Sequence, residues 1–172
     1  MCFDSAVATG RHTPNQHVLF LLILMYRMNI DVPYGIQVAR AARVVAVLGI
    51  KTEKQARQPA FFVPEFLQQQ CQKRIIPVPV YFPDATNILG EHVVRDLKEI
   101  REQVDILDIF RPSAALDYRL MQDILDMNPR PKIVWLQVGI RNEHFEKSIL
   151  EAGIDLVVDK CLKVEAAQEC RL

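Results

Sequence analysis

Short apolar runs alternate with amphipathic segments along most of this chain. Five runs are rich in β-branched residues and apolar nearly throughout, which is typical of strands buried on both faces of a sheet. The predicted strands are Val44–Leu48, Arg74–Val78, Val104–Ile109, Lys132–Gln137 and Ile154–Val158. The segments between them predict helices at Phe62–Gln72, Val93–Glu102, Ala114–Met127 and Glu143–Ala152. Ser113 and Asn142 are the expected N-caps of the last two helices, because their side chains can accept hydrogen bonds from the first helical turn.

This alternation of strands and helices predicts an α/β fold. Parallel neighbours need crossover connections, and these connections place helices on both faces of the sheet. We therefore predict a Rossmann-like, doubly wound five-stranded parallel sheet with the strand order 3-2-1-4-5, numbered along the chain. Residues 41–172 are expected to form this domain, and residues 1–40 an N-terminal extension.

The N-terminal extension has a composition of its own. Residues 1–43 contain four arginines and two acids but no lysine, a bias found in organelle transit peptides. The apolar run Val18–Tyr26 is about half as long as the roughly 20 residues that a membrane-spanning helix needs. Two interpretations stay open: a targeting segment for a mitochondrion or plastid, or a poorly ordered tail on a cytoplasmic protein. Under the second interpretation, Met25 or Met28 is an alternative translation start.

Composition and charge narrow the class of partner. The chain carries 21 Lys and Arg against 21 Asp and Glu, a formal net charge of zero, so we predict neither nucleic acid nor membrane as a partner. The four histidines lack metal-ligand spacing, and we predict no metal. The cysteines form no C-x-x-C pair, which favours a reducing, intracellular compartment over a disulfide framework. They are Cys2, Cys71, Cys161 and Cys170.

The candidate binding residues lie in loops that follow the predicted strands. In a doubly wound sheet, ligands bind at the carboxyl ends of the strands, near the point where the strand order reverses. Arg111 is the strongest candidate, because a guanidinium group binds phosphate through paired hydrogen bonds. The candidates after the first strand are Gly49, Ile50, Lys51, Thr52, Arg57 and Pro59. The later loops add Phe110, Arg111, Gln137, Val138, Gly139 and Asn142.

The chemistry of these loops argues against a nicotinamide dinucleotide. The fingerprint G-x-G-x-x-G needs three glycines, but no second glycine follows Gly49 before Gly90. The acid expected at the end of the second strand is replaced by Pro77, Val78 and Pro79, a stiff apolar segment suited to packing against an adenine ring. We therefore expect a phosphorylated adenine nucleotide other than NAD.

Six ordered segments resemble those of the small stand-alone CoA-binding Rossmann domain family, which is related to the CoA-binding domain of succinyl-CoA synthetase. They are Val45–Gly49, Arg74–Val78, Ile88–Glu91, Val104–Arg111, Val134–Asn142 and Val158–Cys161. The resemblance implies a CoA or acyl-CoA ligand, with its phosphates near Gly49–Thr52 and its adenine near Pro77–Pro79. It also implies that Phe110–Arg111 and Gln137–Asn142 close the site. The chain departs from the family at Lys51, where a serine often stands.

The residues predict no catalytic arrangement. Asp105 and Asp108 lie three positions apart and point to opposite faces of a strand, so they are not expected to form a carboxylate pair. His92 and His144 occupy no recognisable nucleophile loop. Cys161 is interpreted as a small buried residue, with a mixed disulfide to the CoA thiol as the alternative. We predict a non-catalytic CoA- or acyl-CoA-binding module; the alternative is an enzyme that uses NAD(P) or transfers CoA thioesters.

Overall fold

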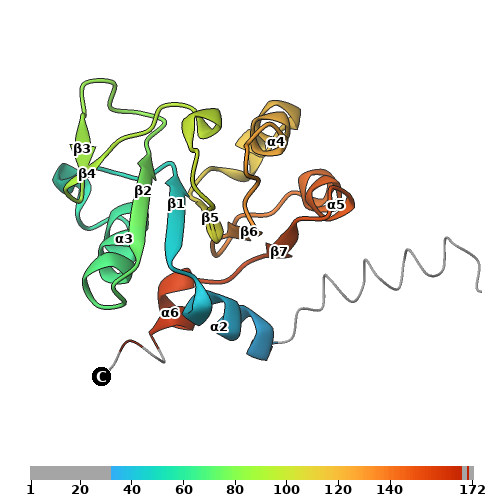
Figure 1. Cartoon of the computed structure of the whole chain (residues 1–172), viewed down its shortest axis with the longest axis horizontal. Coiled ribbons are helices and arrows are strands. Elements are labelled where there is room, and N and C mark those ends of the chain that lie inside the picture. The colour runs from blue at the N-terminus through green and yellow to red at the C-terminus, as the bar shows by residue number, and fades with distance from the viewer. Residues whose placement is uncertain (1–31, 168–169, 171–172) are drawn as a thin grey trace, which may run out of the picture.

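The computed structural model describes residues 32–167 and residue 170. Its centre is a parallel five-stranded sheet with the order β2-β1-β5-β6-β7 (Figure 1). The strands are β1 (Val44–Leu48), β2 (Arg74–Val78), β5 (Ile106–Ile109), β6 (Ile133–Leu136) and β7 (Asp155–Val157). A hairpin of β3 (Asn87–Ile88) and β4 (Glu91–His92) lies beside β2. The predicted Rossmann-like fold is confirmed, and the five predicted strands match to within two residues at each end.

The strand order differs from the predicted 3-2-1-4-5. The third predicted strand, β5, pairs with β1 rather than with β2, so the order in chain numbering is 2-1-3-4-5 and β2 lies at the edge. The physical reason is Pro77, which has no backbone N–H and is tolerated on an edge strand rather than inside a sheet. Its carbonyl accepts a hydrogen bond of 2.9 Å from the amide of Val94, so the chain after the hairpin covers part of this edge.

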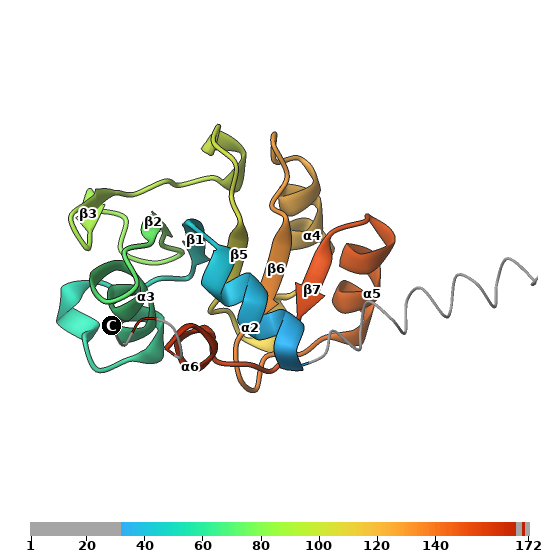
Figure 2. The ribbon, with the colours of Figure 1, turned by 60° about the horizontal axis from the view of Figure 1, so that its bottom comes forward.

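Helices and short turns cover both faces of the sheet (Figure 2). We call one side the α3 face; it carries α2 (Val32–Ala41), α3 (Pro59–Gln69) and α6 (Leu162–Ala166). We call the other side the α5 face; it carries the 3-10 turns η2 (Leu97–Glu99) and η3 (Ser113–Ala115), and the helices α4 (Tyr118–Leu125) and α5 (Glu143–Glu151). A further 3-10 turn, η1 (Glu53–Gln55), lies in the loop after β1.

Side-chain alternation along the strands divides the core between these two faces. On β1, Val45 and Val47 belong to the cluster of the α3 face, whereas Ala46 and Leu48 belong to the cluster of the α5 face. Each of these four side chains is buried, as the continuous apolar run predicted. Trp135 on β6 is fully buried on the α3 face, and its Nε1 donates a hydrogen bond of 2.7 Å to the carbonyl of Lys160. Trp135 is therefore a core residue of the α3 face.

The helix predicted at Val93–Glu102 is wrong. The amide of Val93 bonds to the carbonyl of Thr86 next to the hairpin, and Val94 bonds to Pro77 of β2. Backbone groups that pair with neighbouring strands are not available for a helix, and both residues are β-branched. Only the 3-10 turn η2 remains of the predicted helix, and Asp96 caps it by accepting from the amide of Lys98.

The two predicted helix caps had different outcomes. Asn142 caps α5 by accepting a hydrogen bond from the amide of Phe145, as predicted. Ser113 does not cap α4, because that helix begins later and Asp117 accepts from the amide of Leu120 instead. The Ser113 hydroxyl accepts from the amide of Arg141 and so ties two loops together.

Residues 32–40, assigned to the extension from the sequence, form most of α2. Ala39 is fully buried in the core of the α3 face, so this helix packs on the domain. The apolar run Val18–Tyr26, the two alternative start residues and Cys2 lie outside the described residues. Among the residues that the structure does describe, no helix has both the length and the apolar character needed to span a membrane.

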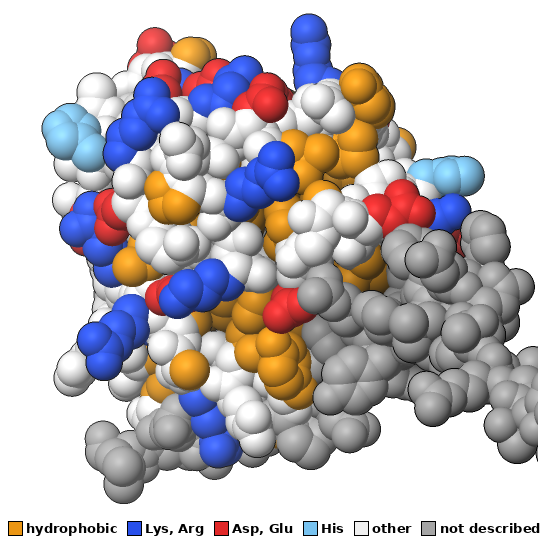
Figure 3. Space-filling model, turned by 45° about the vertical axis from the view of Figure 1, so that its right-hand side comes forward, with side chains coloured by type: hydrophobic (Ala, Val, Ile, Leu, Met, Phe, Trp, Pro, Cys, Tyr) orange, Lys and Arg blue, Asp and Glu red, His pale blue; other side chains and the backbone are white. Residues whose placement is uncertain are grey.

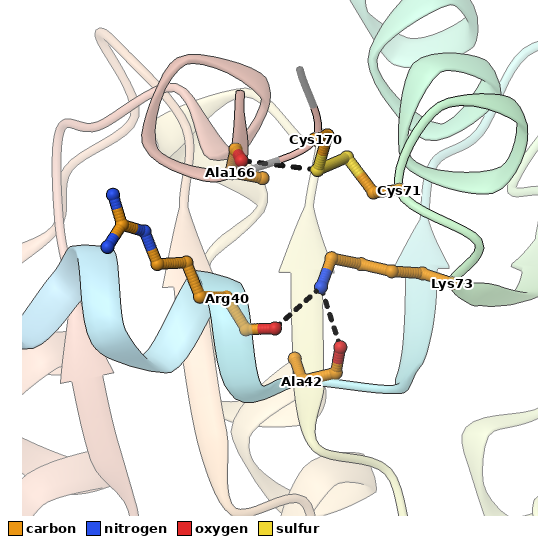
Figure 4. Close-up of a disulfide and its surroundings, with 6 residues drawn as sticks. All are labelled: Arg40, Ala42, Cys71, Lys73, Ala166 and Cys170. Atoms are coloured by element: carbon orange, nitrogen blue, oxygen red, sulfur yellow. Dashed lines mark hydrogen bonds between the residues drawn. A yellow bond between two sulfur atoms is a disulfide. The ribbon is translucent and has the colours of Figure 1, made fainter. Parts of the chain in front are cut away.

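A disulfide joins Cys71, which follows α3, to Cys170, which follows α6 (Figure 4). Their Cα atoms lie 4.9 Å apart although 99 positions separate them in the chain. The expectation of reduced cysteines is therefore wrong for this pair, because the packing of α6 against α3 brings together residues that no sequence motif links. Nearby, the buried ammonium of Lys73 donates to the carbonyls of Arg40 and Ala42 at the end of α2. These contacts fasten the three helical elements of the α3 face to one another.

Candidate functional site

A cavity of about 460 Å³ opens on the α3 face, at the carboxyl ends of β5 and β6 and beside the first turn of α3. Its position agrees with the general rule for ligand sites in open α/β sheets. The wall is mostly apolar, with a few polar groups. It is lined by Gln58, Pro59, Ala60, Phe62, Val63, Phe110, Arg111, Pro112, Gln137, Val138, Ile140 and Cys161.

Gly49 allows the loops after β1 and β5 to lie against each other. Its φ is +90°, and a Cβ atom added there would lie 2.4 Å from the carbonyl oxygen of Phe110. Only glycine fits such a position without strain. The following residue, Ile50, is fully buried and holds the loop in the core. The glycine thus brings Phe110 and Arg111 next to the loop that leads to α3.

A proline within α3 couples this loop to the helix. Pro64 has no N–H and cannot bond to the carbonyl of Ala60, four residues earlier. That carbonyl instead accepts a hydrogen bond of 3.1 Å from the amide of Lys51. The loop after β1 is therefore hydrogen-bonded to the first turn of α3, which starts at Pro59, three residues before the predicted start.

The first turn of α3 presents a positive end to the cavity. No side chain hydrogen-bonds the N-terminal amides of this 11-residue helix within the described residues, and its N-cap, Gln58, lines the cavity together with Pro59 and Ala60. Pro59 has no N–H, and the amides of Phe61 and Phe62 donate to the carbonyl of Gln58. The aligned peptide dipoles, rather than free amides, make this helix start favourable for an anion. This end of the cavity therefore suits a phosphate group.

Arg111 is the cationic residue of the cavity wall. Its Nη1 atom is buried and has no hydrogen-bond partner within the described part of the chain. A buried donor without a partner is unfavourable, and a guanidinium group pairs best with a carboxylate or phosphate. The arrangement therefore indicates an anionic ligand beside Arg111.

A buried amide on the cavity wall is hydrogen-bonded to a buried acid behind it. Asp108 on β5 is fully buried, and Gln137 after β6 is 5% exposed. The Gln137 Nε2 atom donates to both carboxylate oxygens of Asp108, at 2.9 and 3.1 Å. Burial raises the pKa of Asp108 to about 7, even though hydrogen bonds from Gln137 and the amide of Ile109 favour the ionised form. The sequence analysis did not predict this pair, because Asp108 and Gln137 belong to two strands, β5 and β6, that become neighbours only in the folded sheet.

Asp105 has different hydrogen-bond partners from Asp108, and the two do not form a carboxylate pair, as the sequence indicated. It accepts hydrogen bonds from the amides of Arg43 and Val44 and from the ammonium of Lys132. Partial burial alone would raise the pKa of Asp105, but these three donors more than offset it and lower that pKa below its usual value. Asp105 is therefore a structural acid at the opposite end of β5.

The predicted adenine segment is buried rather than open. Pro77, Val78 and Pro79 are all buried, so the open surface at this edge is formed by the residues that follow. Tyr81 is 59% exposed, and the ammonium of Lys51 lies 4.9 Å from the centre of its ring and 5.5 Å from that of Phe82. A cation and two aromatic rings thus lie beside the loop after β1, outside the cavity wall.

Several other predicted site residues are engaged in holding the fold. The Asn142 side chain accepts from Phe145 and donates to the carbonyl of Leu116. The amide of Gly139 donates to the carboxylate of Asp159. The Thr52 hydroxyl bonds to the side chain of Gln55. Arg57 is exposed in the loop before α3.

The candidate cations do not form one basic surface. Arg141 pairs with the buried Glu146 at 3.0 Å, which raises the pKa of the arginine, and Lys51 lies over aromatic rings. On the face drawn in Figure 3, positive and negative side chains are interspersed with apolar ones. No group of three or more potential metal ligands occurs among the described residues.

The structure brings five predicted site residues together in the cavity: Pro59, Phe110, Arg111, Gln137 and Val138. Cys161, which follows β7, also lines the cavity; its thiol is free and the residue is partly buried. Phe62 and Val63 were not predicted. The signal for them was their place near the start of a helix that follows the glycine loop.

Comparisons with known proteins show the family and the fold of this chain. A family model described as "CoA binding domain" matches residues 43–167. The uncharacterized protein YneT of Bacillus subtilis (strain 168) is 32% identical over 99 residues, which are 58% of this chain and 69% of that protein. A solved Thermus thermophilus structure, cell-free ID.343, is 38% identical with a TM-score of 0.71, over 80% of this chain and 98% of its own. A hypothetical protein from Pyrococcus horikoshii OT3, 19% identical, shares the fold with a TM-score of 0.66 over 80% of this chain and 91% of its own.

Proposed function

This chain belongs to the CoA binding domain family, and from that premise we propose that it binds coenzyme A or an acyl-CoA without catalysing a reaction on it. The ligand occupies the cavity on the α3 face and the surface beside the loop after β1. The observation that carries the proposal is the buried, unpartnered Nη1 atom of Arg111 on the cavity wall.

The phosphates supply the anion that this part of the cavity lacks. Arg111 and the first turn of α3 both line the cavity. A pyrophosphate between them pairs with the guanidinium group and with the positive end of the helix. Gly49 keeps the backbone close at this point, because any side chain there would meet Phe110.

The adenine end extends toward β2. The Tyr81 ring is exposed, and the ammonium of Lys51 lies over it. An adenine ring stacks on an aromatic ring, and a lysine nearby attracts phosphate. This extends the sequence prediction for Lys51 and moves the adenine contact from the buried Pro77–Pro79 segment to the residues just after it.

The pantetheine end and any acyl group lie in the apolar part of the cavity. Phe62, Val63, Val138 and Ile140 line that part. Apolar walls favour the methylene groups of the arm, because their burial removes apolar surface from water. Cys161 lies on the same wall as these residues and faces the thiol end of the ligand.

The absence of catalysis is supported by the chemistry of the lining. The described lining residues include no histidine and no carboxylate, so the wall lacks the commonest general bases for a bound thioester. Asp108 is fully buried behind the wall and is hydrogen-bonded to the lining residue Gln137.

Ligand screening tests the proposal directly. We expect CoA and acetyl-CoA to raise the melting temperature of the purified protein, and NAD and NADP to leave it unchanged. A ligand at 100 times its dissociation constant stabilises the native state by about 2.7 kcal/mol. Stabilisation by NAD or NADP alone would move the assignment to an oxidoreductase.

Substitution of Arg111 tests the site itself. We expect Arg111→Ala to weaken CoA binding by about 10- to 100-fold, since a hydrogen bond to a charged group contributes about 1.5–3 kcal/mol. Calorimetric titration measures the affinity, and a melting curve checks that the variant is folded. Arg119→Ala is the matched control, because Arg119 is exposed on α4 across the sheet. Equal affinity of the Arg111→Ala variant and the unmodified protein would remove Arg111 from the site.

A further inference from the structure

We propose that Gln137, oriented by Asp108, accepts a hydrogen bond from an amide N–H of the pantetheine arm of CoA. The inference rests on the proposed CoA site and assigns one specific contact within it. Gln137 is then a binding residue that contacts the pantetheine arm, and Asp108 is a positioning residue that acts through Gln137.

The orientation of the Gln137 amide follows from its partner. Its Nε2 atom lies 2.9 and 3.1 Å from the two carboxylate oxygens of Asp108. An ionised carboxylate only accepts hydrogen bonds, so it holds the NH₂ end of the amide toward itself and turns the carbonyl end away. The Oε1 atom of Gln137 accepts no hydrogen bond from the described part of the chain, and the residue lines the cavity. The Oε1 atom of Gln137 is therefore a free hydrogen-bond acceptor on the cavity wall.

The cost of this pair indicates that it serves a ligand. Asp108 lies between Val47 of β1 and Trp135 of β6 in the sheet register, both fully buried and apolar. A leucine or valine there would pack without desolvating a carboxylate. An acid whose single side-chain partner is an amide on the cavity wall is instead typical of a functional site.

The position of Gln137 selects the pantetheine arm over the adenine. Gln137 follows β6, whereas the proposed adenine contact Tyr81 follows β2, with β1 and β5 between the two strands. Lys51, in the loop after β1, lies over the Tyr81 ring. Next to Gln137 the wall consists of apolar groups such as Val138 and Ile140. An arm with secondary amides that enters this wall needs an acceptor for its N–H groups, because a buried amide without a partner is costly.

The test compares two ligands that differ only in the arm. CoA carries the pantetheine arm, and adenosine 3′-phosphate 5′-diphosphate lacks it. We expect Gln137→Met, which keeps the length of the side chain but removes the acceptor, to weaken CoA binding about tenfold, the size of one hydrogen bond. The same variant should bind adenosine 3′-phosphate 5′-diphosphate as tightly as the unmodified protein does. Titrations at pH 8.5 keep Asp108 ionised, because burial raises its pKa to about 7.

Asp108→Asn tests the positioning role. An asparagine can donate to the Gln137 carbonyl, so the Gln137 amide is no longer held in one orientation. We expect weaker binding of CoA and unchanged binding of adenosine 3′-phosphate 5′-diphosphate, a selectivity that general loosening of the fold would not produce. Gln69→Met is the matched control, because Gln69 is exposed at the end of α3.

Each other outcome contradicts a specific statement. If Gln137→Met loses both ligands equally, Gln137 supports the fold or the adenine and the inference is wrong. If it loses neither, the contact does not exist, although CoA binding itself stands. If the unmodified protein binds neither ligand, the proposed function fails as well.

Discussion

Among the described residues, each face of the sheet buries one carboxylate, and the two carboxylates have different partners. On the α5 face, Glu146 is 1% exposed and receives hydrogen bonds from the guanidinium of Arg141 and the amide of Asn142. On the α3 face, Asp108 is fully buried and its side-chain partner is the neutral amide of Gln137. The first acid has a charged partner and joins a loop to a helix, whereas the second has none and borders the cavity.

This difference shows which buried polar groups belong to the fold and which to the site. Glu146 belongs to a closed network in which Asn142 also caps α5 and bonds to Leu116. The α3 face instead carries a raised pKa at Asp108 and a buried guanidinium nitrogen at Arg111 without a partner in the described chain. Unsatisfied groups of this kind on a cavity wall are expected where a ligand completes them.

The largest expected effect is a loss of folding stability from alanine substitutions in the core, which tests whether the two faces of the sheet are packed equally well. Trp135 and Leu136 are adjacent on β6, fully buried, and point to opposite faces. We expect Trp135→Ala to lower the free energy of unfolding by about 3–5 kcal/mol, and Leu136→Ala by about 2–5 kcal/mol. Urea denaturation monitored by circular dichroism measures both. A loss below about 1 kcal/mol for Trp135→Ala would mean that the α3 face is loosely packed.

The next effect concerns the pH dependence of Asp108. Its pKa is about 7 in the folded protein against 3.8 when solvated, so the native state retains a proton that the unfolded chain releases. This contribution to stability is complete below about pH 4 and is lost as the pH rises through about 7, by at most about 1.4 kcal/mol for each pH unit. We expect the stability of the unmodified protein relative to the Asp108→Asn variant to fall over this window.

Urea titrations of both proteins between pH 4 and pH 8 provide the measurement. Glu146→Gln serves as the comparison on the α5 face, because Arg141 compensates the charge of Glu146. A constant difference between the unmodified protein and Asp108→Asn across this range would show that Asp108 is ionised throughout.

The smallest expected effect is the stability lost when the hydrogen-bond network of Glu146 on the α5 face is broken. Arg141→Met removes the cation and leaves Glu146 buried with the amide of Asn142 as a remaining partner. We expect a loss of about 1–3 kcal/mol, the usual cost of a poorly satisfied buried group. Lys147→Met is a matched control, since its pair with Glu151 is long at 3.7 Å and exposed. If the two variants are equally stable, Arg141 does not compensate Glu146.

The sequence predicted the strands well because burial on both faces leaves a continuous apolar run, as in Val44–Leu48. It did not predict the strand order, although Pro77 carried the information that β2 is an edge strand. The hairpin near Val93 was missed because its strands have two residues each and leave no periodic pattern. The bond between Cys71 and Cys170 depends on how two helices pack, which spacing in the chain does not encode.

For the candidate site, topology predicted which loops meet but not which side chains line the cavity. Arg111 and Gln137 could be selected because charged and polar residues at the ends of buried strands are unusual. Asn142 looked equally suitable, yet its side chain is used by the helix that it starts. Asp108 reads as one more strand residue, and only the register of β5 and β6 shows that it reaches Gln137.

The hydrogen bond between Lys51 and Ala60 depends on an atom that Pro64 lacks. The inner carbonyls of a helix normally accept hydrogen bonds from amides of the same helix. A proline in the second turn has no amide to donate, so one carbonyl oxygen can accept a hydrogen bond from another segment. Here the donor belongs to the loop after β1, which carries proposed phosphate and adenine contacts. A backbone hydrogen bond, rather than a side chain, therefore fixes the position of this loop against the helix. Any other amino acid at position 64 would bring a rival donor for the same oxygen and would loosen that registration.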